Sequence, residues 1–302
     1  MNNEKKSLVF FGSGPVAAES LRLLENTFSI EAVVTKPTTE REMHLACPGS
    51  PIFLVNNKAE LDTLIESSNF SSPCGVLIDF GIIVSSKVID YFEFGIINSH
   101  FSLLPELRGA DPISFAILEG KEKTGVSLML LVEAMDEGPI LSVGQLSLDG
   151  SETTHTLSSD LIELSYNLLL ECLPKYLSGE INPVSQDVIT RQFNLEASYT
   201  RKLTKSDGFI DWNKTAEQIE REIRAYIGWP KSSTSLNGID CVITKAHSLE
   251  LSGEPGELFI NAKTLGVYCG HGALVIERLK PAGKNAMDSS SFLNGYINKL
   301  NI

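Results

Sequence analysis

Cysteine is scarce in this sequence, and the few cysteines present stand far apart. None of the five has a partner at CxxC spacing, so the sequence predicts neither a zinc site nor a disulfide framework. They are Cys47, Cys74, Cys172, Cys241 and Cys269. This usage fits a reducing cytosol, and we expect a cytoplasmic protein.

Long hydrophobic runs are absent as well. The start MNNEKKSLVFFGSG passes from charged residues into the apolar run SLVFF, which is too short for a signal peptide or a membrane helix. No other stretch could span a bilayer, so we expect no membrane partner. With 302 residues, of which 42% are hydrophobic and 21% charged, the chain can bury a large core and suits two domains better than one.

Positive charge is in deficit, and the deficit is uneven along the chain. The net charge of −13 argues against broad non-specific binding of nucleic acids. Residues 1–190 carry 11 Lys and Arg against 26 Asp and Glu, whereas residues 191–302 carry 14 against 12. Because this change falls near the turn-rich GEINPVSQD, we predict domains at 1–180 and 207–302 that are joined by a linker at 181–206.

The two predicted domains differ in their secondary-structure patterns. In the first, the β-prone runs SLVFF, IEAVVT, CGVLIDFG and FGIINSHF alternate with helical segments. This indicates a doubly wound, Rossmann-like α/β domain with a parallel sheet covered on both faces. In the second, the pair Thr215 and Gln218 predicts a capped helix, and short strands follow it, two of them joined at Asn237-Gly238. We predict a small, OB-like β-barrel there.

A glycine turn after the first predicted strand allows two interpretations. Gly12 and Gly14 match the start of a dinucleotide-binding fingerprint, with Ala17 in place of the third glycine. The second strand, however, ends at Lys36 without the acidic residue that binds the ribose of NAD. We therefore expect the glycines to allow close packing of strand, turn and helix, and we do not expect NAD to bind.

Polar residues appear where the strand FGIINSHF should end. Asn98 and His100 are two residues apart, so their side chains emerge on one side of an extended strand, at the sheet edge where α/β proteins bind ligands. Asp136 lies in a polar loop after the next predicted strand and can approach His100 there. A carboxylate orients an imidazole, which suits proton exchange. Taken singly, these residues also have ordinary explanations as a buried histidine, a turn former and a cap.

Two blocks of sequence resemble the 10-formyltetrahydrofolate-dependent formyltransferase family. NSHFSLLPELRGADPISFAI is similar to the family's asparagine-x-histidine, SLLP and RGxxPI signature, and GVSLMLLVEAMDEGPIL is similar to its second block. The resemblance implies a catalytic triad at Asn98, His100 and Asp136. It also implies that 10-formyltetrahydrofolate is the formyl donor, that no metal takes part, and that a monomer needs no obligate protein partner.

The same resemblance places the folate against the SLLP segment and two neighbouring loops. It implies folate contacts for nine residues, and apolar walls of this kind suit a flat pterin. They are Ile82, Ile83, Val84, Ser102, Leu103, Leu104, Pro105, Val132 and Ala134. For Leu103 and Leu104, simple core packing is an equally good interpretation.

The carboxyl-terminal half resembles those family members that formylate initiator methionyl-tRNA. The similarity lies in YTRKLTKSDGFIDW, in Arg224-Ala225-Tyr226 with Trp229-Pro230, and in LKPAGKNAM. It implies that this domain holds tRNA, and basic residues are the candidates for phosphate contacts, although each could equally be an ordinary surface charge. The candidates are Arg191, Arg201, Lys202, Lys205 and Lys245.

One departure from the family concerns residues 36–44, KPTTEREMH. Familiar members carry a longer glycine- and lysine-rich loop there that reaches the tRNA acceptor stem, whereas this short segment offsets Lys36 and Arg41 with Glu40 and Glu42. We expect altered tRNA discrimination. Two alternative functions stay open: an amino-sugar formyltransferase, and a non-catalytic protein that binds folate or tRNA.

Overall fold

The computed structural model describes residues 5–261 and 263–300, and the chain divides into two compact units. The first unit contains the residues up to Pro112 together with Lys123–Ser147 and Ser158–Thr200. The second contains Ile113–Glu122, Leu148–Leu157 and the residues from Arg201 onward. The change of unit after Thr200 falls inside the predicted linker, 181–206, and two short segments from the first 180 residues belong to the second unit.

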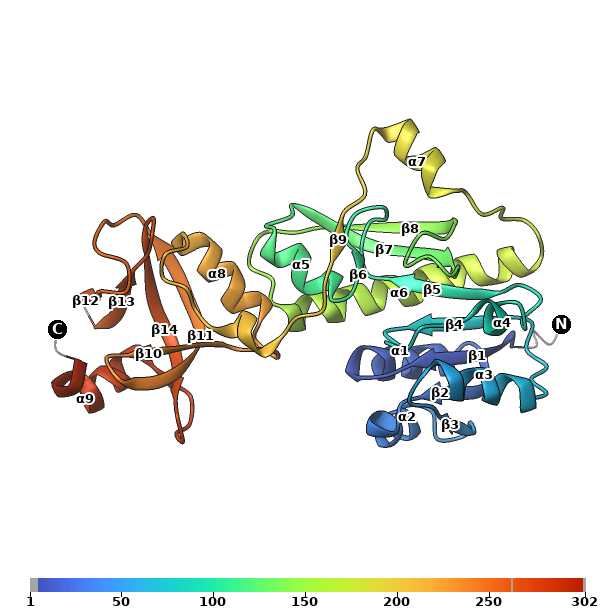
Figure 1. Cartoon of the computed structure of the whole chain (residues 1–302), viewed down its shortest axis with the longest axis horizontal. Helices are drawn as coiled ribbons and strands as arrows, with labels where there is room; N and C mark the ends of the chain where they lie inside the picture. The colour runs from blue at the N-terminus through green and yellow to red at the C-terminus, as the bar shows by residue number, and fades with distance from the viewer. Residues whose placement is uncertain (1–4, 262, 301–302) are drawn as a thin grey trace. The chain divides into compact units, whose positions relative to one another are not determined.

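The first unit is built on a seven-stranded sheet with the order β3-β2-β1-β4-β5-β7-β8 (Figure 1). The five strands from β3 to β5 run parallel, whereas β7 is antiparallel to both β5 and β8. The strands are β1 (Ser7–Gly12), β2 (Ser29–Thr35), β3 (Ile52–Leu54), β4 (Gly75–Ile78), β5 (Ile96–His100), β7 (Lys123–Leu130) and β8 (Ile140–Ser147). A separate two-stranded ladder pairs β6 (Arg108–Gly109) with β9 (Tyr199–Thr200).

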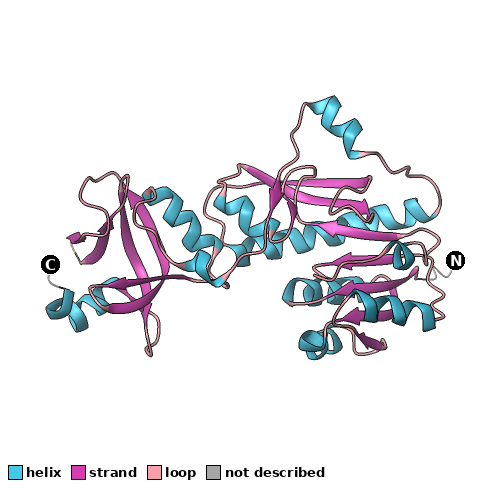
Figure 2. Ribbon diagram, in the orientation of Figure 1, coloured by secondary structure: helices cyan, strands magenta, loops and turns pink. Residues whose placement is uncertain are grey.

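Helices accompany this sheet, as Figure 2 shows in cyan. They are α1 (Pro15–Glu25), the 3-10 helix η1 (Pro37–Thr39), α2 (Glu40–Ala46), α3 (Lys58–Ser67), α4 (Ser86–Ile89), most of α6 (Thr154–Leu177), and α7 (Gln186–Phe193). The central strands β1, β4 and β5 are almost wholly buried, which explains the apolar runs of β1 and β4 and the two isoleucines that begin β5.

The glycine turn after β1 is tightly packed. A β-carbon on Gly12 would come within 2.6 Å of the Phe10 ring, 2.7 Å of the Ala17 methyl and 2.8 Å of the Ile78 carbonyl oxygen. Gly14 has φ of +95°, which favours glycine. Close packing of strand, turn and helix therefore accounts for Gly12, as the sequence predicted, whereas Gly14 is explained by its positive φ.

Two segments that the sequence indicated as loop or linker are partly helical. Within 36–44, residues from Glu40 form helix α2, whose buried Met43 and Ala46 pack it beside α1. Within the predicted linker, Ser185 caps helix α7 by accepting a hydrogen bond from the Asp187 amide. The turn residues in both stretches are thus caps and flanks of short helices, which composition alone does not distinguish from loops.

The second unit carries a six-stranded antiparallel sheet with the order β10-β11-β14-β13-β12, in which β15 also pairs with β14. Its strands are β10 (Ser232–Leu236), β11 (Ile239–Leu249), β12 (Leu258–Asn261), β13 (Thr264–Tyr268), β14 (Ala273–Pro281) and β15 (Met287–Asp288). Its helices are α5 (Pro112–Leu118), the 3-10 helix η2 (Lys205–Gly208), α8 (Ala216–Ala225) and α9 (Ser289–Leu300).

Two local predictions for this unit are confirmed. The Thr215 hydroxyl accepts a hydrogen bond from the Gln218 amide while the Gln218 side chain accepts one from the Thr215 amide, which forms the capping box of α8. Asn237 and Gly238 have φ of +46° and +83° and join β10 to β11 as a two-residue hairpin turn. Helix α8 then packs its Ile219 against the sheet core.

The predicted fold class, a doubly wound, Rossmann-like α/β domain followed by a small OB-like β-domain, is confirmed in its two-domain α/β and β plan, and the strands of the second domain form an antiparallel sheet. The one difference in the first sheet is the direction of β7 and β8, because the predicted sheet was parallel. Leu130 and Ile140 are joined by a short loop, and such a loop can connect only antiparallel neighbours. None of the helices in the described part of the chain is long and apolar enough to cross a membrane.

Candidate active site

The end of β5 brings Asn98 and His100 to one place in the sheet. All five residues of β5 are buried, with Asn98 and His100 each only 6% exposed. In the ladder with β7, Asn98 lies opposite Met129 and His100 opposite Ser127. Two polar side chains held this rigidly by a central strand can present fixed donors to a ligand.

Asp136 reaches both residues from the loop that joins β7 to β8. Its Oδ1 accepts a hydrogen bond of 3.3 Å from the Asn98 amide, and its Oδ2 accepts one of 2.7 Å from the Gly109 backbone amide. The same Oδ2 lies 3.6 Å from Nδ1 of His100. The three side chains that the sequence singled out therefore form one connected cluster around the Asp136 carboxylate.

The second nitrogen of His100 is also engaged. Nε2 lies 2.9 Å from the backbone oxygen of Leu107, and a carbonyl oxygen can only accept a hydrogen bond, so Nε2 carries a hydrogen. Leu107 has φ of +56°, and its own amide donates to the Ser198 hydroxyl over 2.9 Å. The imidazole is thus held at one nitrogen, which leaves Nδ1, facing Asp136, as the position that can gain or lose a proton.

Three further residues surround Asp136 that sequence reasoning did not assign. Arg108 lies inside the RGxxPI motif, so the sequence drew attention to it without giving it a role. Gln186 and Tyr199 are 50 and 63 positions beyond Asp136, and although Tyr199 opens the stretch YTRKLTKSDGFIDW, the sequence assigns neither residue a role here. Both hydrogen-bond to Arg108 in the folded chain.

The nine predicted folate residues differ in exposure. Ser102 is fully buried, and its hydroxyl donates to the Glu106 carbonyl over 2.6 Å. Leu104 packs in a small core cluster with Met129 and Ile140. Val84 and Pro105 are buried, and Leu103 and Ile82 are half-buried. Ile83, Val132 and Ala134 are exposed, so their side chains offer the most surface to a ligand.

The five predicted tRNA residues also fall into two groups. Arg201 donates to the Asp207 carboxylate over 2.9 Å, and Lys245 forms an ion pair of 2.8 Å with Glu277. Arg191, Lys202 and Lys205 are exposed. All five are exposed, and since Arg201 and Lys245 already have carboxylate partners, the other three are better placed to meet a phosphate.

The Arg201–Asp207 contact leads to a prediction about stability. The hydrogen bond from Arg201 holds the pKa of the Asp207 carboxyl below its usual range, and Thr204 adds to this through its backbone amide and its hydroxyl. A depressed pKa stabilises the folded state above the carboxyl's unfolded pKa, about 4, and this contribution is lost as pH falls through the folded value. We expect Asp207→Asn to lower the free energy of unfolding at pH 7 by about 1 kcal/mol.

Urea unfolding at pH 7 and at pH 3 measures this effect. The difference in the free energy of unfolding between the wild type and Asp207→Asn should be smaller at pH 3 than at pH 7. Asp240→Asn, which changes an exposed carboxylate on β11 of the same unit, is the matched control and should show a small gap at both. An Asp207→Asn gap of equal size at both pH values would contradict the assigned role of the charge.

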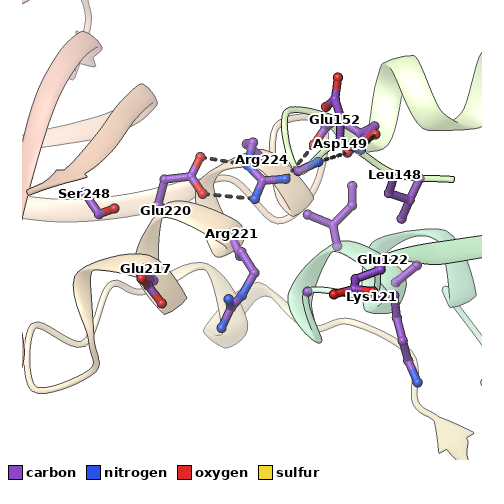
Figure 3. A pocket seen from close by; sticks show the side chains of 14 residues that line it. Lys121, Glu122, Leu148, Asp149, Glu152, Glu217, Glu220, Arg221, Arg224 and Ser248 are labelled. Carbon is purple, nitrogen blue, oxygen red and sulfur yellow. Dashed lines mark hydrogen bonds and ion pairs between the residues drawn. The ribbon is translucent and has the colours of Figure 1, made fainter.

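A cavity of about 380 Å³ lies wholly among residues of the second unit (Figure 3). Arg224 is tied there to the Glu220 carboxylate by hydrogen bonds of 2.7 and 3.0 Å and to the Glu152 carbonyl by one of 2.8 Å. Its charged lining residues are Lys121, Glu122, Asp149, Glu152, Glu217, Glu220, Arg221 and Arg224. Because carboxylates outnumber basic groups, the cavity does not suit an anion such as folate or a phosphate.

No metal centre is indicated in residues 5–261 and 263–300, where no group of three or more His, Cys, Asp or Glu side chains is arranged to hold an ion. The Asn98, His100 and Asp136 cluster offers hydrogen-bond donors and a group that can carry a proton. Such a cluster suits a reaction in which negative charge develops on an oxygen while a proton moves.

Comparison with known proteins relates both units to one family. The family model described as "Formyl transferase" matches residues 9–173, and "Formyl transferase, C-terminal domain" matches residues 202–297. A methionyl-tRNA formyltransferase of Lachnospira eligens is 32% identical over 95% of this chain and 96% of its own length. One from Streptococcus pneumoniae is 32% identical over 98% of this chain and 97% of its own length.

Solved structures share the fold. HypX of Aquifex aeolicus in complex with tetrahydrofolic acid has a TM-score of 0.66 at 16% identity over 98% of this chain, which spans 48% of the HypX length. An N-formyltransferase of Helicobacter canadensis, in complex with folinic acid and dTDP-3-aminofucose, has a TM-score of 0.65 at 17% identity over 90% of this chain and 98% of its own length. At these identities the likeness concerns the fold alone.

Proposed function

Because the chain belongs to the formyl transferase family, we propose that it transfers a formyl group from 10-formyltetrahydrofolate to the free amino group of initiator methionyl-tRNA. The observation that carries this proposal is the match to methionyl-tRNA formyltransferases along nearly the whole of both chains. The connected cluster of Asn98, His100 and Asp136 supports it independently, since it supplies the donors and the proton carrier that formyl transfer needs.

In the proposed reaction the amine of methionine attacks the formyl carbon. A bond forms between that nitrogen and the carbon, and the formyl oxygen becomes an oxyanion. The bond from the carbon to N10 of the folate then breaks, and the electron pair returns to N10. The amine loses one proton overall and N10 gains one, so the step is balanced without an oxidant or a metal.

Asn98 is proposed to stabilise the oxyanion. Its amide nitrogen carries two hydrogens, and only one is used in the 3.3 Å contact with Asp136. The second can meet the oxyanion as it forms. A prepositioned donor of this kind lowers a reaction barrier by roughly 3 kcal/mol where water is excluded, and Asn98 is 6% exposed.

His100 is proposed to carry the proton between the two nitrogens. With Nε2–H fixed on Leu107, a proton taken up at Nδ1 makes an imidazolium whose charge faces the Asp136 carboxylate. Asp136 thus orients the ring and stabilises its charged form during turnover. The ring is held at Nε2 by Leu107, and the Asp136 carboxylate already lies 3.6 Å from Nδ1.

For the folate, the exposed apolar side chains of Ile83, Val132 and Ala134 are proposed to face the pterin. The other six predicted residues are buried or half-buried and are proposed to shape the wall of the site. An apolar surface with a few polar groups is the usual composition of a site for a small planar ligand.

The tRNA contact is proposed for the exposed Lys202 and Lys205. We expect the double change to alanine to raise KM for methionyl-tRNA several-fold, to leave kcat nearly unchanged, and to reduce the salt dependence of binding by about one phosphate contact per lysine. Initial rates at several salt concentrations measure all three. Alanine at Lys58 and Lys123, which are exposed lysines of the first unit, is the control. A salt dependence that the Lys202 and Lys205 changes leave unaltered would count against this surface.

The acceptor is tested by direct comparison. The purified protein and 10-formyltetrahydrofolate are incubated with charged initiator tRNA, and separately with a nucleotide-linked amino sugar. Formylation of the tRNA supports the proposal, whereas formylation of the sugar alone would replace it with the amino-sugar alternative. Formylation of neither acceptor would favour the non-catalytic alternative.

A further inference from the structure

Gln186 lies beside the cluster and is almost completely buried, with 2% of its surface exposed. It is the first residue of helix α7, and its side chain lies against the loop that carries Asp136. Its amide nitrogen donates to the Asp136 carbonyl over 2.8 Å and to the Gly138 carbonyl over 2.9 Å. Both hydrogens of the amide are therefore used on the backbone of one short turn.

The other end of the same side chain is also occupied. Oε1 of Gln186 accepts hydrogen bonds from Nε and Nη2 of Arg108, at 3.2 and 2.7 Å. Arg108 in turn donates from Nη1 to the Tyr199 hydroxyl over 2.8 Å and lies 3.2 Å from the Glu137 carboxylate. Tyr199 completes this set by donating to Glu137 over 3.1 Å.

These contacts hold Asp136 in a backbone conformation that it would not otherwise favour. Its φ is +53°, in the left-handed region that side chains rarely adopt. Gln186 fixes the carbonyl of Asp136 on one side, and the Gly109 amide fixes its carboxylate on the other. Gly138 fits the same turn because a β-carbon there would fall 1.7 Å from the Leu130 carbonyl oxygen.

We propose that Gln186 is a positioning residue for formyl transfer, which keeps the Asp136 carboxylate in contact with Asn98 and His100 by tying down the turn at 136–138. This inference rests on the proposed formyl transfer activity, because it concerns the geometry of the same cluster. It adds a residue 86 positions after His100, from a helix outside the catalytic sheet.

The chemistry of glutamine explains why this residue type is needed. The two carbonyls can only accept hydrogen bonds and the guanidinium can only donate them, so one side chain must donate twice and accept as well. Leucine keeps the size and loses both functions. Glutamate keeps the acceptor for Arg108 and has no hydrogens for the Asp136 and Gly138 carbonyls.

Three variants test the proposal: Gln186→Leu, Gln186→Glu and Gln192→Leu. Gln192 is an exposed glutamine on the same helix and serves as the matched control. For Gln186→Leu we expect kcat to fall about 10- to 100-fold, because a reacting group would be displaced by part of an ångström. KM for both substrates should stay within about threefold of the wild-type value. The control should match the wild type.

Gln186→Glu separates positioning from stability. Glutamate can still accept hydrogen bonds from Arg108. The Gln186→Glu variant should therefore have a melting temperature closer to the wild-type value than Gln186→Leu has, while its kcat stays low. A binding titration with tetrahydrofolate, which requires no acceptor, shows that each variant keeps its folate site. Recovery of kcat by glutamate would overturn the proposal, because the Asp136 and Gly138 contacts would then be unnecessary.

The outcomes also separate this inference from the proposed function. If the wild type formylates methionyl-tRNA and Gln186→Leu does so with an unchanged kcat, the inference about Gln186 fails and the function stands. If the wild type formylates no methionyl-tRNA while it binds tetrahydrofolate, the proposed function fails first, and the positioning role falls with it.

Discussion

Replacement of His100 by alanine is expected to lower kcat for formyl transfer by about 100- to 10,000-fold, the range for loss of a positioned general acid and base. The imidazole is the one group in the described cluster that can both take up and release a proton at Nδ1 while Nε2 stays bound to Leu107. KM for tRNA should change little, because the proposed phosphate contacts are made by Lys202 and Lys205.

Single-turnover formylation of methionyl-tRNA measures the effect of His100→Ala, and a tetrahydrofolate titration shows that the variant keeps its folate site. His44→Ala, which removes an exposed imidazole at the end of α2, is the control and should behave as the wild type. Unchanged formylation by His100→Ala, in a preparation shown to be free of other formyltransferases, would remove the proton-transfer role.

Replacement of Asp136 by asparagine is expected to reduce kcat by about 100-fold or more. The carboxylate accepts from the Asn98 amide at one oxygen and from the Gly109 amide at the other. An asparagine must turn an NH₂ group toward one of these donors, so one hydrogen bond becomes a repulsive contact. The variant also removes the negative charge that faces the His100 imidazolium.

The effect of Asp136→Asn on kcat is measured with saturating tRNA and 10-formyltetrahydrofolate. Glu133→Gln is the matched control, since it removes an exposed carboxylate from the same loop and should leave kcat within about twofold. A kcat for Asp136→Asn close to that of the wild type would show that His100 works without a charged partner, and the proposed roles would need revision.

The positions of Asn98 and His100 could be predicted because a β-strand has a simple period. Two residues that are two apart at the end of an apolar strand share one side, whatever the rest of the fold does. For Asp136 the sequence predicted only that its loop can approach His100, and not the contacts that its carboxylate makes. Its left-handed backbone and its contact with the Gly109 amide depend on how two distant loops meet, and no local pattern describes that.

Gln186 could not be predicted as part of the site for the same reason. Its stretch is rich in turn residues, and the sequence indicated a linker where helix α7 begins. The hydrogen bond to the Asp136 carbonyl joins residues 50 positions apart in the chain, and only the three-dimensional structure brings them together. A glutamine that uses all its hydrogen-bonding groups on backbone carbonyls and an arginine looks like any other polar residue in the sequence.

The candidate tRNA residues show a similar limit. All five are basic, and composition cannot tell a free lysine from one that is already neutralised. Lys245 meets Glu277 because β11 and β14 pair side by side, with a bulge near Lys245. Arg201 meets Asp207 across the first turn of η2. Lys202 and Lys205 are as exposed as these two and differ from them in having no such pair among the contacts described above.

The most direct test of the proposed function follows a labelled formyl group from 10-formyltetrahydrofolate. The purified protein is incubated with the labelled folate and charged initiator tRNA, and the methionine is then released and identified. The account predicts label on the α-amino group of methionine, at a rate that His100→Ala reduces at least about 100-fold. Label recovered only as free formate, or methionine that stays unlabelled, would contradict it.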